Sequence, residues 1–343
     1  MVFKRISLFL LVTFLFCGCS AVSTSTQKAQ SFGSEKVLHA VWYDDQLQGA
    51  ERDVARATLP EPDLRAPERT VPVNELPPLP KELRQVIVRV EPENGRKVMA
   101  LTFDLCERAP HLAGYQKDLV NYLRSEGIKA TFFAGGKWMR THPEKAMQLM
   151  ADPLFEMGNH AWTHGNFALM NEAEVRQQLT WTQAQYEVLY DTLADRAKDF
   201  GVGLEMKNIP SHLKLMRLPY GRNNERTGDI VASMGLPMIQ WSTEGEQDEH
   251  ERTVEELVQW NLHKLQPGTI VLMHANAVPK KTHKLVPQLV PELRKRGYEF
   301  VTVSELLRMG PVVTVTDGYF DEPGDNRYVD AIFGGKGTLG RIK

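Results

Sequence analysis

The sequence contains only three cysteines, no concentrated block of lysine and arginine, and no apolar run long enough to stay in a membrane as a permanent helix. Its formal net charge is −2. A chain without concentrated positive charge lacks the electrostatic features of nucleic-acid-binding proteins, so we expect no nucleic acid partner. The length of 343 residues fits one large domain of the α/β barrel class or two small domains.

Residues 1–18 have the features of an export signal. A basic start precedes an apolar run from Ile6 to Phe16, which is too short to cross a bilayer as a stable helix. Gly18-Cys19 then resembles the end of a bacterial lipoprotein signal, in which the cysteine becomes the acylated first residue. We therefore expect an exported cell-envelope lipoprotein with a membrane anchor on Cys19, and the alternative is an ordinary secretion signal.

Processing at this signal would leave a single thiol. Cys17 would leave with the signal and Cys19 would carry lipid, so only Cys106 would remain and no internal disulfide could form. Ser20 directly after the lipidated cysteine favours the outer membrane, facing the periplasm, in a Gram-negative host.

We expect residues 19–96 to form a tether and a proline-rich extension. Ser20–Ser34 is rich in serine, threonine and glutamine and has little to bury, which is typical of a flexible tether. Leu59–Pro80 contains seven prolines, which prevent a regular helix. We interpret both segments as linkers, and the stretch between them has some helical character without identifiable chemistry.

In residues 97–307, short apolar runs typical of buried parallel strands alternate with amphipathic segments typical of helices. The predicted strands are Val98–Phe103, Ala130–Phe133, Leu215–Leu218, Met238–Trp241, Ile270–Met273 and Phe300–Val303. The predicted helices are Tyr115–Glu126, Pro143–Met150, Glu172–Phe200, Thr227–Met234, Thr253–Leu265 and His283–Arg296. The alternation predicts an α/β fold with a parallel sheet, followed by a surface tail over residues 308–343.

His160 and His164 are a candidate metal site. They lie four residues apart and follow the apolar stretch Leu154–Met157. Two imidazoles at this spacing can converge on one divalent cation when they follow the end of a strand. Taken alone, such a pair more often consists of surface or hydrogen-bonded histidines.

Other reactive side chains also lie at strand ends. Asp104 ends the first strong strand, Arg217 lies in Leu215–Leu218, and His274 ends Ile270–Met273. Each alone would more often be a helix cap or a structural group. Because the carboxyl ends of parallel strands meet at one edge of a sheet, their coincidence favours a common site.

Four motifs, in family order, make the stretch from about Lys97 to Leu307 resemble the NodB-type polysaccharide deacetylases of carbohydrate esterase family 4. They are Thr102-Phe103-Asp104-Leu105, His160-Ala161-Trp162-Thr163-His164, Arg217-Leu218-Pro219-Tyr220 and Leu272-Met273-His274. The resemblance implies a distorted (β/α) barrel of about seven parallel strands. It also implies metal-assisted hydrolysis of an N-acetyl group on an amino sugar.

The resemblance assigns a role to each motif. His160 and His164 would bind one divalent ion, which we expect to be zinc, while Asp104 would act as general base and His274 as general acid.

The remaining motif residues would support this chemistry. Arg217 would orient Asp104, and the backbone N–H of Tyr220 would help bind the oxyanion. Trp241 and Leu272 would shape the slot for the acetyl methyl group.

Two positions depart from the family pattern. The second aspartate of the first motif, a metal ligand in usual members, is Leu105 here, and leucine cannot bind metal. Glu107, the thiolate of Cys106 or water could replace it, and a thiolate would favour zinc. The aspartates that position the acidic histidine are also altered, and we predict Asp248 as the partner of His274.

These observations predict an exported, metal-dependent deacetylase of an N-acetylated polysaccharide such as peptidoglycan or poly-N-acetylglucosamine. One alternative is a non-catalytic glycan-binding lipoprotein with a degenerate barrel, and another is a metal-dependent hydrolase of a non-sugar amide. The presence of both Asp104 and His274 argues against the binding protein, which needs neither a base nor an acid.

Overall fold

The computed structural model describes residues 32–333, so the predicted signal and Cys19 lie outside the described residues. Within this range, no helix is both long enough and apolar enough to cross a membrane.

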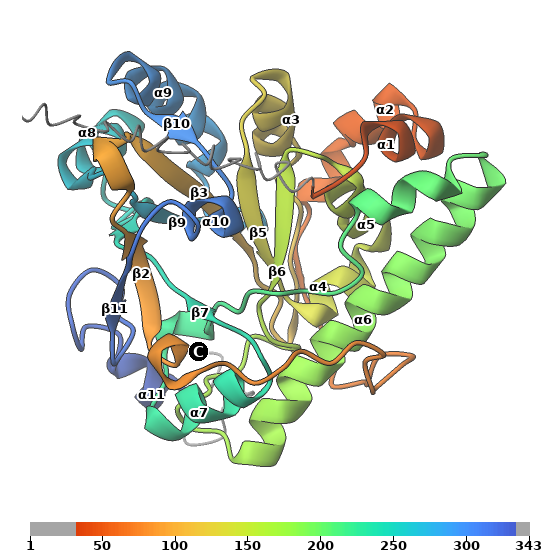
Figure 1. Cartoon of the computed structure of the whole chain (residues 1–343), viewed down its shortest axis with the longest axis horizontal. Coiled ribbons are helices and arrows are strands. Elements are labelled where there is room, and N and C mark those ends of the chain that lie inside the picture. The colour runs from red at the N-terminus through yellow and green to blue at the C-terminus, as the bar shows by residue number, and fades with distance from the viewer. Residues whose placement is uncertain (1–31, 334–343) are drawn as a thin grey trace, which may run out of the picture. The chain divides into compact units, whose positions relative to one another are not determined.

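Parallel strands form the centre of the fold (Figure 1). The larger sheet has the spatial order β6 (Phe155–Asn159), β5 (Ala130–Ala134), β3 (Val98–Leu105), β9 (Ile270–His274) and β8 (Thr243–Glu244), and β10 (Glu299–Phe300) pairs with the start of β3. In the smaller sheet, β2 (Val86–Val90) lies between β7 (Met238–Ile239) and antiparallel β11 (Val312–Val315). Met216 bridges β6 to β7 and so joins both sheets into a distorted (β/α) barrel.

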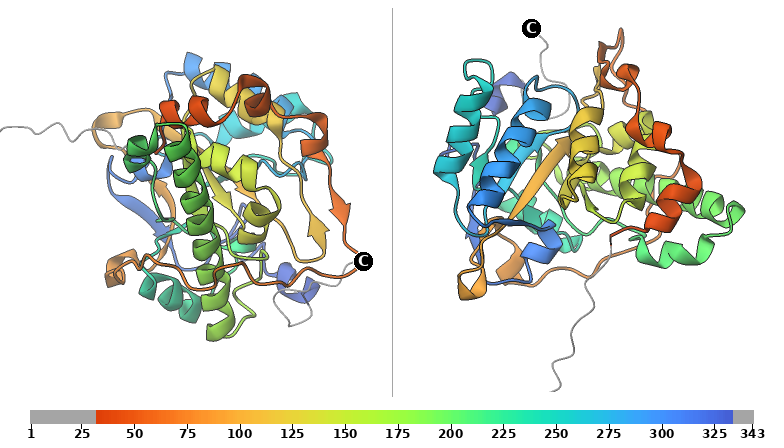
Figure 2. Two further views of the ribbon diagram at one scale, coloured as in Figure 1. Left: turned by 90° about the vertical axis from the view of Figure 1, so that its right-hand side faces the viewer. Right: turned by 90° about the horizontal axis from the view of Figure 1, so that it is seen from above.

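Helices cover the outside of the strands, and Figure 2 shows them from two further sides. They are α3 (Lys117–Ser125), α4 (Gly136–Thr141), α5 (Pro143–Ala151), α6 (Glu172–Asp199), α7 (Glu225–Ser233), α8 (Val254–Lys264), α9 (Thr282–Lys295) and α10 (Val303–Leu306). Side chains cap several N-termini: Asn171 accepts from the backbone of α6, and Thr253 from that of α8. The predicted alternation of strands and helices is confirmed, except that Leu215–Leu218 contributes only the isolated bridges of Met216 and that the last predicted strand ends at Phe300.

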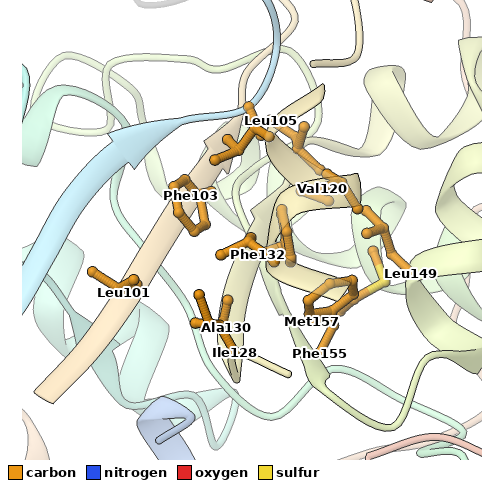
Figure 3. Packing of buried hydrophobic residues seen from close by; sticks show 14 of the residues in the cluster. Leu101, Phe103, Leu105, Val120, Ile128, Ala130, Phe132, Leu149, Phe155 and Met157 are labelled. Carbon is orange, nitrogen blue, oxygen red and sulfur yellow. The ribbon is translucent and has the colours of Figure 1, made fainter. Parts of the chain in front are cut away.

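The packing of the core determines which side chains of β3 are available for a functional site. Leu101, Phe103 and Leu105 pack in one apolar cluster with Val120 of α3 and Leu149 of α5 (Figure 3). Because successive side chains of a strand point to opposite faces, Asp104 faces away from this cluster. Leu105 therefore belongs to the layer between strands and helices.

Residues 35–48, between the two predicted linkers, confirm the expected helical character, but they belong to the folded body rather than to a tether or extension. This stretch forms α1 (Glu35–Val41) and α2 (Asp44–Gln48), which lie against α3 and α5. Val37, Leu38, Trp42 and Leu47 are buried in the same core as β3. Their apolar surface is large enough to hold two short helices against the barrel, although neither helix is long enough to show a clear periodicity. Residues 59–80, as predicted, contain no helix or strand.

The predicted domain boundaries at 97 and 307 are also wrong. β2 begins at Val86 and is buried in the smaller sheet, so the barrel starts before residue 97. β11 pairs with β2, and α11 (Tyr328–Ile332) carries Asp330, which forms an ion pair with Arg222 at 2.6 Å. The C-terminal residues up to 333 are therefore part of the fold.

Candidate functional site

The carboxyl ends of neighbouring strands bring the predicted site residues to one edge of the barrel. In the β3–β9 pairing, Asp104 lies opposite His274. On the other side, β5 connects β3 to β6, whose last residue, Asn159, directly precedes His160. The parallel register thus places residues that are far apart in the sequence within reach of one another.

Arg217 fixes the orientation of Asp104. Its Nη1 donates to Asp104 Oδ1 at 2.9 Å, and both side chains are buried. Its other nitrogens donate to the carbonyls of Ile239 and Gln240, each at 3.2 Å. Burial lowers the pKa of Arg217 and the charge of Asp104 opposes that shift. With Oδ1 engaged, Oδ2 of Asp104 is the oxygen that faces His160.

His160 turns its Nε2 toward the cluster. Its Nδ1 lies 2.9 Å from the carbonyl oxygen of Arg217. Because a carbonyl only accepts, Nδ1 carries a proton, and Nε2 is the nitrogen that can bind a metal ion. Burial lowers the pKa of His160, but the charges of Asp104 and Cys106 outweigh this effect and raise it. Nε2 lies 3.3 Å from Cys106 Sγ and 3.3 Å from Asp104 Oδ2. A backbone carbonyl that fixes the tautomer in this way is typical of metal-binding histidines.

Cys106, His160 and His164 together form a possible metal site. Their ligand atoms lie within 4.8 Å of one another. His164 has a left-handed backbone (φ 55°), and its Nδ1 is buried without a hydrogen-bond partner among residues 32–333. Burial opposes ionisation of the Cys106 thiol, but His164 and His160 hold its pKa well below its usual range. Two imidazoles and a thiolate are a donor set that suits zinc.

Glu107, the other predicted replacement for Leu105, is engaged elsewhere. Its Oε1 accepts from Lys137 Nζ at 2.7 Å and from Thr141 Oγ1 at 2.9 Å, while Oε2 accepts from the backbone of Ala113 at 2.8 Å. Lys137 is itself fully buried, so this carboxylate compensates its charge. The geometry therefore favours Cys106 over Glu107 as the third protein ligand.

His274 faces the same cluster from the end of β9 and pairs with Glu246. Its Nδ1 lies 2.7 Å from Glu246 Oε2, and its backbone N–H donates to Oε1 at 3.1 Å. Burial lowers the pKa of His274, but the Glu246 carboxylate and the Cys106 sulfur together outweigh this effect, and the pKa lies well above its usual range. His274 is thus held as a cation whose Nε2 can donate a proton.

The prediction that Asp248 partners His274 is wrong. The side chain of Asp248 is 52% exposed and lies 3.6 Å from Arg252. Glu246, two residues earlier, turns inward instead and also accepts from the hydroxyl of Thr282. Spacing along a loop does not determine which of several acids turns inward, so the sequence could not distinguish them.

The residues predicted to contact substrate lie in two environments. Tyr220 has a left-handed backbone (φ 60°), and its ring packs edge-on against His164 with 4.3 Å between centroids. Trp241 and Leu272 are buried in one apolar cluster, and Trp241 Nε1 donates to the carbonyl of Phe320 at 2.7 Å. Their roles toward the oxyanion and the acetyl methyl group stay predictions.

A cavity of about 570 Å³ lies over the cluster and is lined by Cys106, His164, Tyr220 and His274. Part of its wall comes from the N-terminal extension, because β1 (Ala57–Thr58) pairs with β4 (His111–Leu112) and both line the cavity. Sequence reasoning missed this wall, since a two-residue strand carries no detectable periodicity.

Comparison with known proteins identifies the family. Residues 91–196 match the family model described as polysaccharide deacetylase. A peptidoglycan-N-acetylglucosamine deacetylase of Bacillus cereus is 30% identical over 233 residues, which are 67% of this chain and 98% of that protein. The chain belongs to the NodB-type polysaccharide deacetylases of carbohydrate esterase family 4. The family resemblance predicted from the four motifs is thereby confirmed.

Other relatives in the family are longer. A peptidoglycan-N-acetylglucosamine deacetylase of Listeria monocytogenes is 29% identical over 68% of this chain and 43% of its own length. A bifunctional xylanase/deacetylase of Pseudobutyrivibrio xylanivorans is 27% identical over 63% of this chain and 31% of its own. The chain thus spans less than half the length of these two proteins.

Solved structures support the fold. A peptidoglycan N-acetylglucosamine deacetylase aligns with TM-score 0.52 at 21% identity, over 65% of this chain and 93% of that one. A family 4 pseudoenzyme from Bacillus anthracis aligns with TM-score 0.51 at 23% identity, over 66% and 69%. Because this fold occurs in an enzyme and in a pseudoenzyme, activity has to be argued from the site itself.

Proposed function

We propose that the chain hydrolyses N-acetyl groups of an amino-sugar polysaccharide with the help of one divalent ion, most simply zinc. The observation that carries the proposal is the arrangement around Cys106. A buried carboxylate, Asp104, and a histidine held as a cation, His274, offer ligand atoms within 4.8 Å of this sulfur and of each other. A base, an acid and a ligand cluster in such proximity are what amide hydrolysis requires.

The residues present fit a metal ion. Cys106, His160 and His164 would hold it, with the His160 tautomer fixed by a backbone carbonyl and the buried Nδ1 of His164 free of other partners among the described residues. When bound, the ion would polarise the acetamide carbonyl and lower the pKa of a water molecule.

The side chains would move the protons. Asp104, oriented by Arg217 through Oδ1, would accept a proton from the attacking water at Oδ2. His274, whose Nδ1 is engaged by Glu246, would donate a proton from Nε2 to the departing amine. The two groups lie on adjacent strands in direct register, so one acetamide can contact both.

Metal removal tests the proposal. Zinc-loaded protein is expected to release acetate from N-acetylglucosamine oligomers or from peptidoglycan glycan strands. Chelation should abolish the release, and one equivalent of zinc should restore it. A protein that binds zinc and glycan but releases no acetate from either substrate would contradict the proposal and favour a non-catalytic glycan-binding lipoprotein.

We also propose that the protein is a lipoprotein of the cell envelope, anchored through Cys19. Cys19→Ala is expected to block metabolic labelling with a fatty-acid analogue and to release the protein from membranes. Cys17→Ala is the matched control, because that residue lies within the predicted signal and should not alter labelling. Full membrane association of Cys19→Ala would contradict the anchor.

A further inference from the structure

The cavity over the site has a positively charged wall. Arg56 reaches it from the N-terminal extension, and Arg108 and His111 reach it from the connection between β3 and β4. Burial lowers the pKa of His111, and the charges of Arg108, Lys137 and Arg56 lower it further. Several positive charges therefore act on one side of the cavity.

Two nitrogen donors of Arg108 lack partners among the described residues. Its Nε and Nη2 are buried, yet neither has a hydrogen-bond partner within residues 32–333. Its guanidinium lies 5.2 Å from the centroid of the Phe333 ring, which holds it from one face. The hydroxyl of Tyr220, which also packs against Phe333, is likewise buried without a partner in the described residues. Buried donors of this kind are normally satisfied, so their position beside a cavity points to a ligand.

The protein's own carboxylates do not neutralise this wall. Glu107 is engaged by Lys137, and the nearby Asp63 is engaged by Arg65 and Arg140 at 2.9 and 2.6 Å. Within the described part of the chain, no carboxylate forms an ion pair with Arg56 or Arg108. Arg56 Nη1 donates to the carbonyl oxygen of Val278 at 3.4 Å. An incoming anion would therefore meet two arginines without competing with an internal carboxylate.

We infer that the glycan recognised here is acidic, and that Arg108, supported by Arg56, binds a carboxylate on the sugar that carries the N-acetyl group or on its neighbour. The inference rests on the proposed function for the site, and it narrows the substrate class from N-acetylated glycans in general to carboxylated ones. A guanidinium can bind a carboxylate through two parallel hydrogen bonds, so it distinguishes such sugars from neutral ones by geometry as well as charge.

Binding to oligosaccharides of matched length tests the inference on the zinc-loaded full chain. The neutral probe is an N-acetylglucosamine oligomer. One acidic probe, a hyaluronan oligosaccharide, carries the carboxylate only on the neighbour of the N-acetylated sugar. The other, a peptidoglycan glycan strand without stem peptides, carries it on every second N-acetylated sugar. We expect calorimetry to give roughly tenfold or stronger preference for at least one acidic probe.

Substitutions of Arg108 test whether the preference for acidic probes comes from the wall of the cavity. Arg108→Gln should remove most of it, and Arg108→Lys, which keeps the charge without the planar fork, should retain a part. Arg308→Gln is the matched control, because Arg308 is exposed just after α10, beside the opposite end of β3. Zinc stoichiometry verifies that each variant keeps its site.

Two outcomes would overturn the inference: equal affinity of the wild type for neutral and acidic probes, or an unchanged preference in Arg108→Gln. Because binding is measured rather than turnover, these outcomes are independent of whether acetate is released. An absence of acetate release would count against the proposed function alone.

Discussion

Asp104→Asn is expected to lower the rate of acetate release by roughly a hundred- to ten-thousand-fold, because that is the usual contribution of a general base. Asparagine keeps the shape of the side chain and can still accept from Arg217, but it cannot take a proton from water. The metal ligands proposed here do not include Asp104, so zinc stoichiometry should be unchanged. Rate and zinc content measured on the same preparation separate the two functions.

Asp248→Asn is the matched control for this substitution. It makes the same chemical change on a side chain that is half exposed and lies beside Arg252 rather than His274. We expect its rate to stay within a few-fold of the wild type. A similarly small effect in Asp104→Asn would show that Asp104 is not the general base.

The proton donor, His274, should determine the alkaline limb of the pH profile of activity. His274→Ala is expected to cost a similar factor of roughly a hundred to ten thousand. Glu246→Gln should act more subtly, since its carboxylate, together with the Cys106 sulfur, holds the pKa of His274 well above the usual range. The acid must be protonated to work, so activity is lost as pH rises through this pKa. Removing the carboxylate should move that alkaline limb to lower pH.

The opposite limb provides the internal comparison. It should move much less in Glu246→Gln, because Glu246 contacts His274 and not Asp104. An alkaline limb that keeps its position in Glu246→Gln would show that His274 is not the proton donor.

The parts of the fold that could be predicted are those with a local physical signal. β3, β5 and β9 are continuous apolar runs, and α6 has a capped start at Asn171, so their existence follows from periodicity and capping. β2 has the same length and apolar character as β5, so the boundary at 97 overlooked a local signal. β11 and the N-terminal helices acquire their stability from contacts with distant segments. Such contacts are absent from any local window, and the predicted boundary at 307 failed for that reason.

The site residues at strand ends could be predicted, and those in loops could not. Asp104, His160 and His274 lie at or just after strand ends, and parallel register converts that position into proximity. The choice between Cys106 and Glu107, and between Glu246 and Asp248, depends on how a loop turns. Neither spacing nor residue type determines this. In the folded chain, Lys137 engages Glu107, which leaves Cys106 as the ligand beside the histidines. The backbone N–H of His274 engages Glu246 rather than Asp248.

Cys106→Ser is expected to weaken zinc binding by at least roughly tenfold to a hundredfold, since even substitutions in the outer shell of metal sites have effects of that size. A serine hydroxyl at the same position is a much poorer ligand than a thiolate. Cobalt substitution gives a readout independent of activity. The wild type should show a thiolate-to-cobalt charge-transfer band, and Cys106→Ser should lack it. Cys106→Asp, which supplies a carboxylate, should bind metal without the band.

Glu107→Gln is the matched comparison, because it changes the adjacent residue that was the other predicted ligand. Its carboxylate balances the buried charge of Lys137, so the substitution should lower the free energy of unfolding by about 3–5 kcal/mol, the usual effect of an uncompensated buried charge. The folded fraction should still bind one zinc and keep the cobalt–thiolate band. If instead Glu107→Gln loses the metal while Cys106→Ser retains it, the ligand set proposed here is wrong, and the loop after β3 must rearrange when the ion binds.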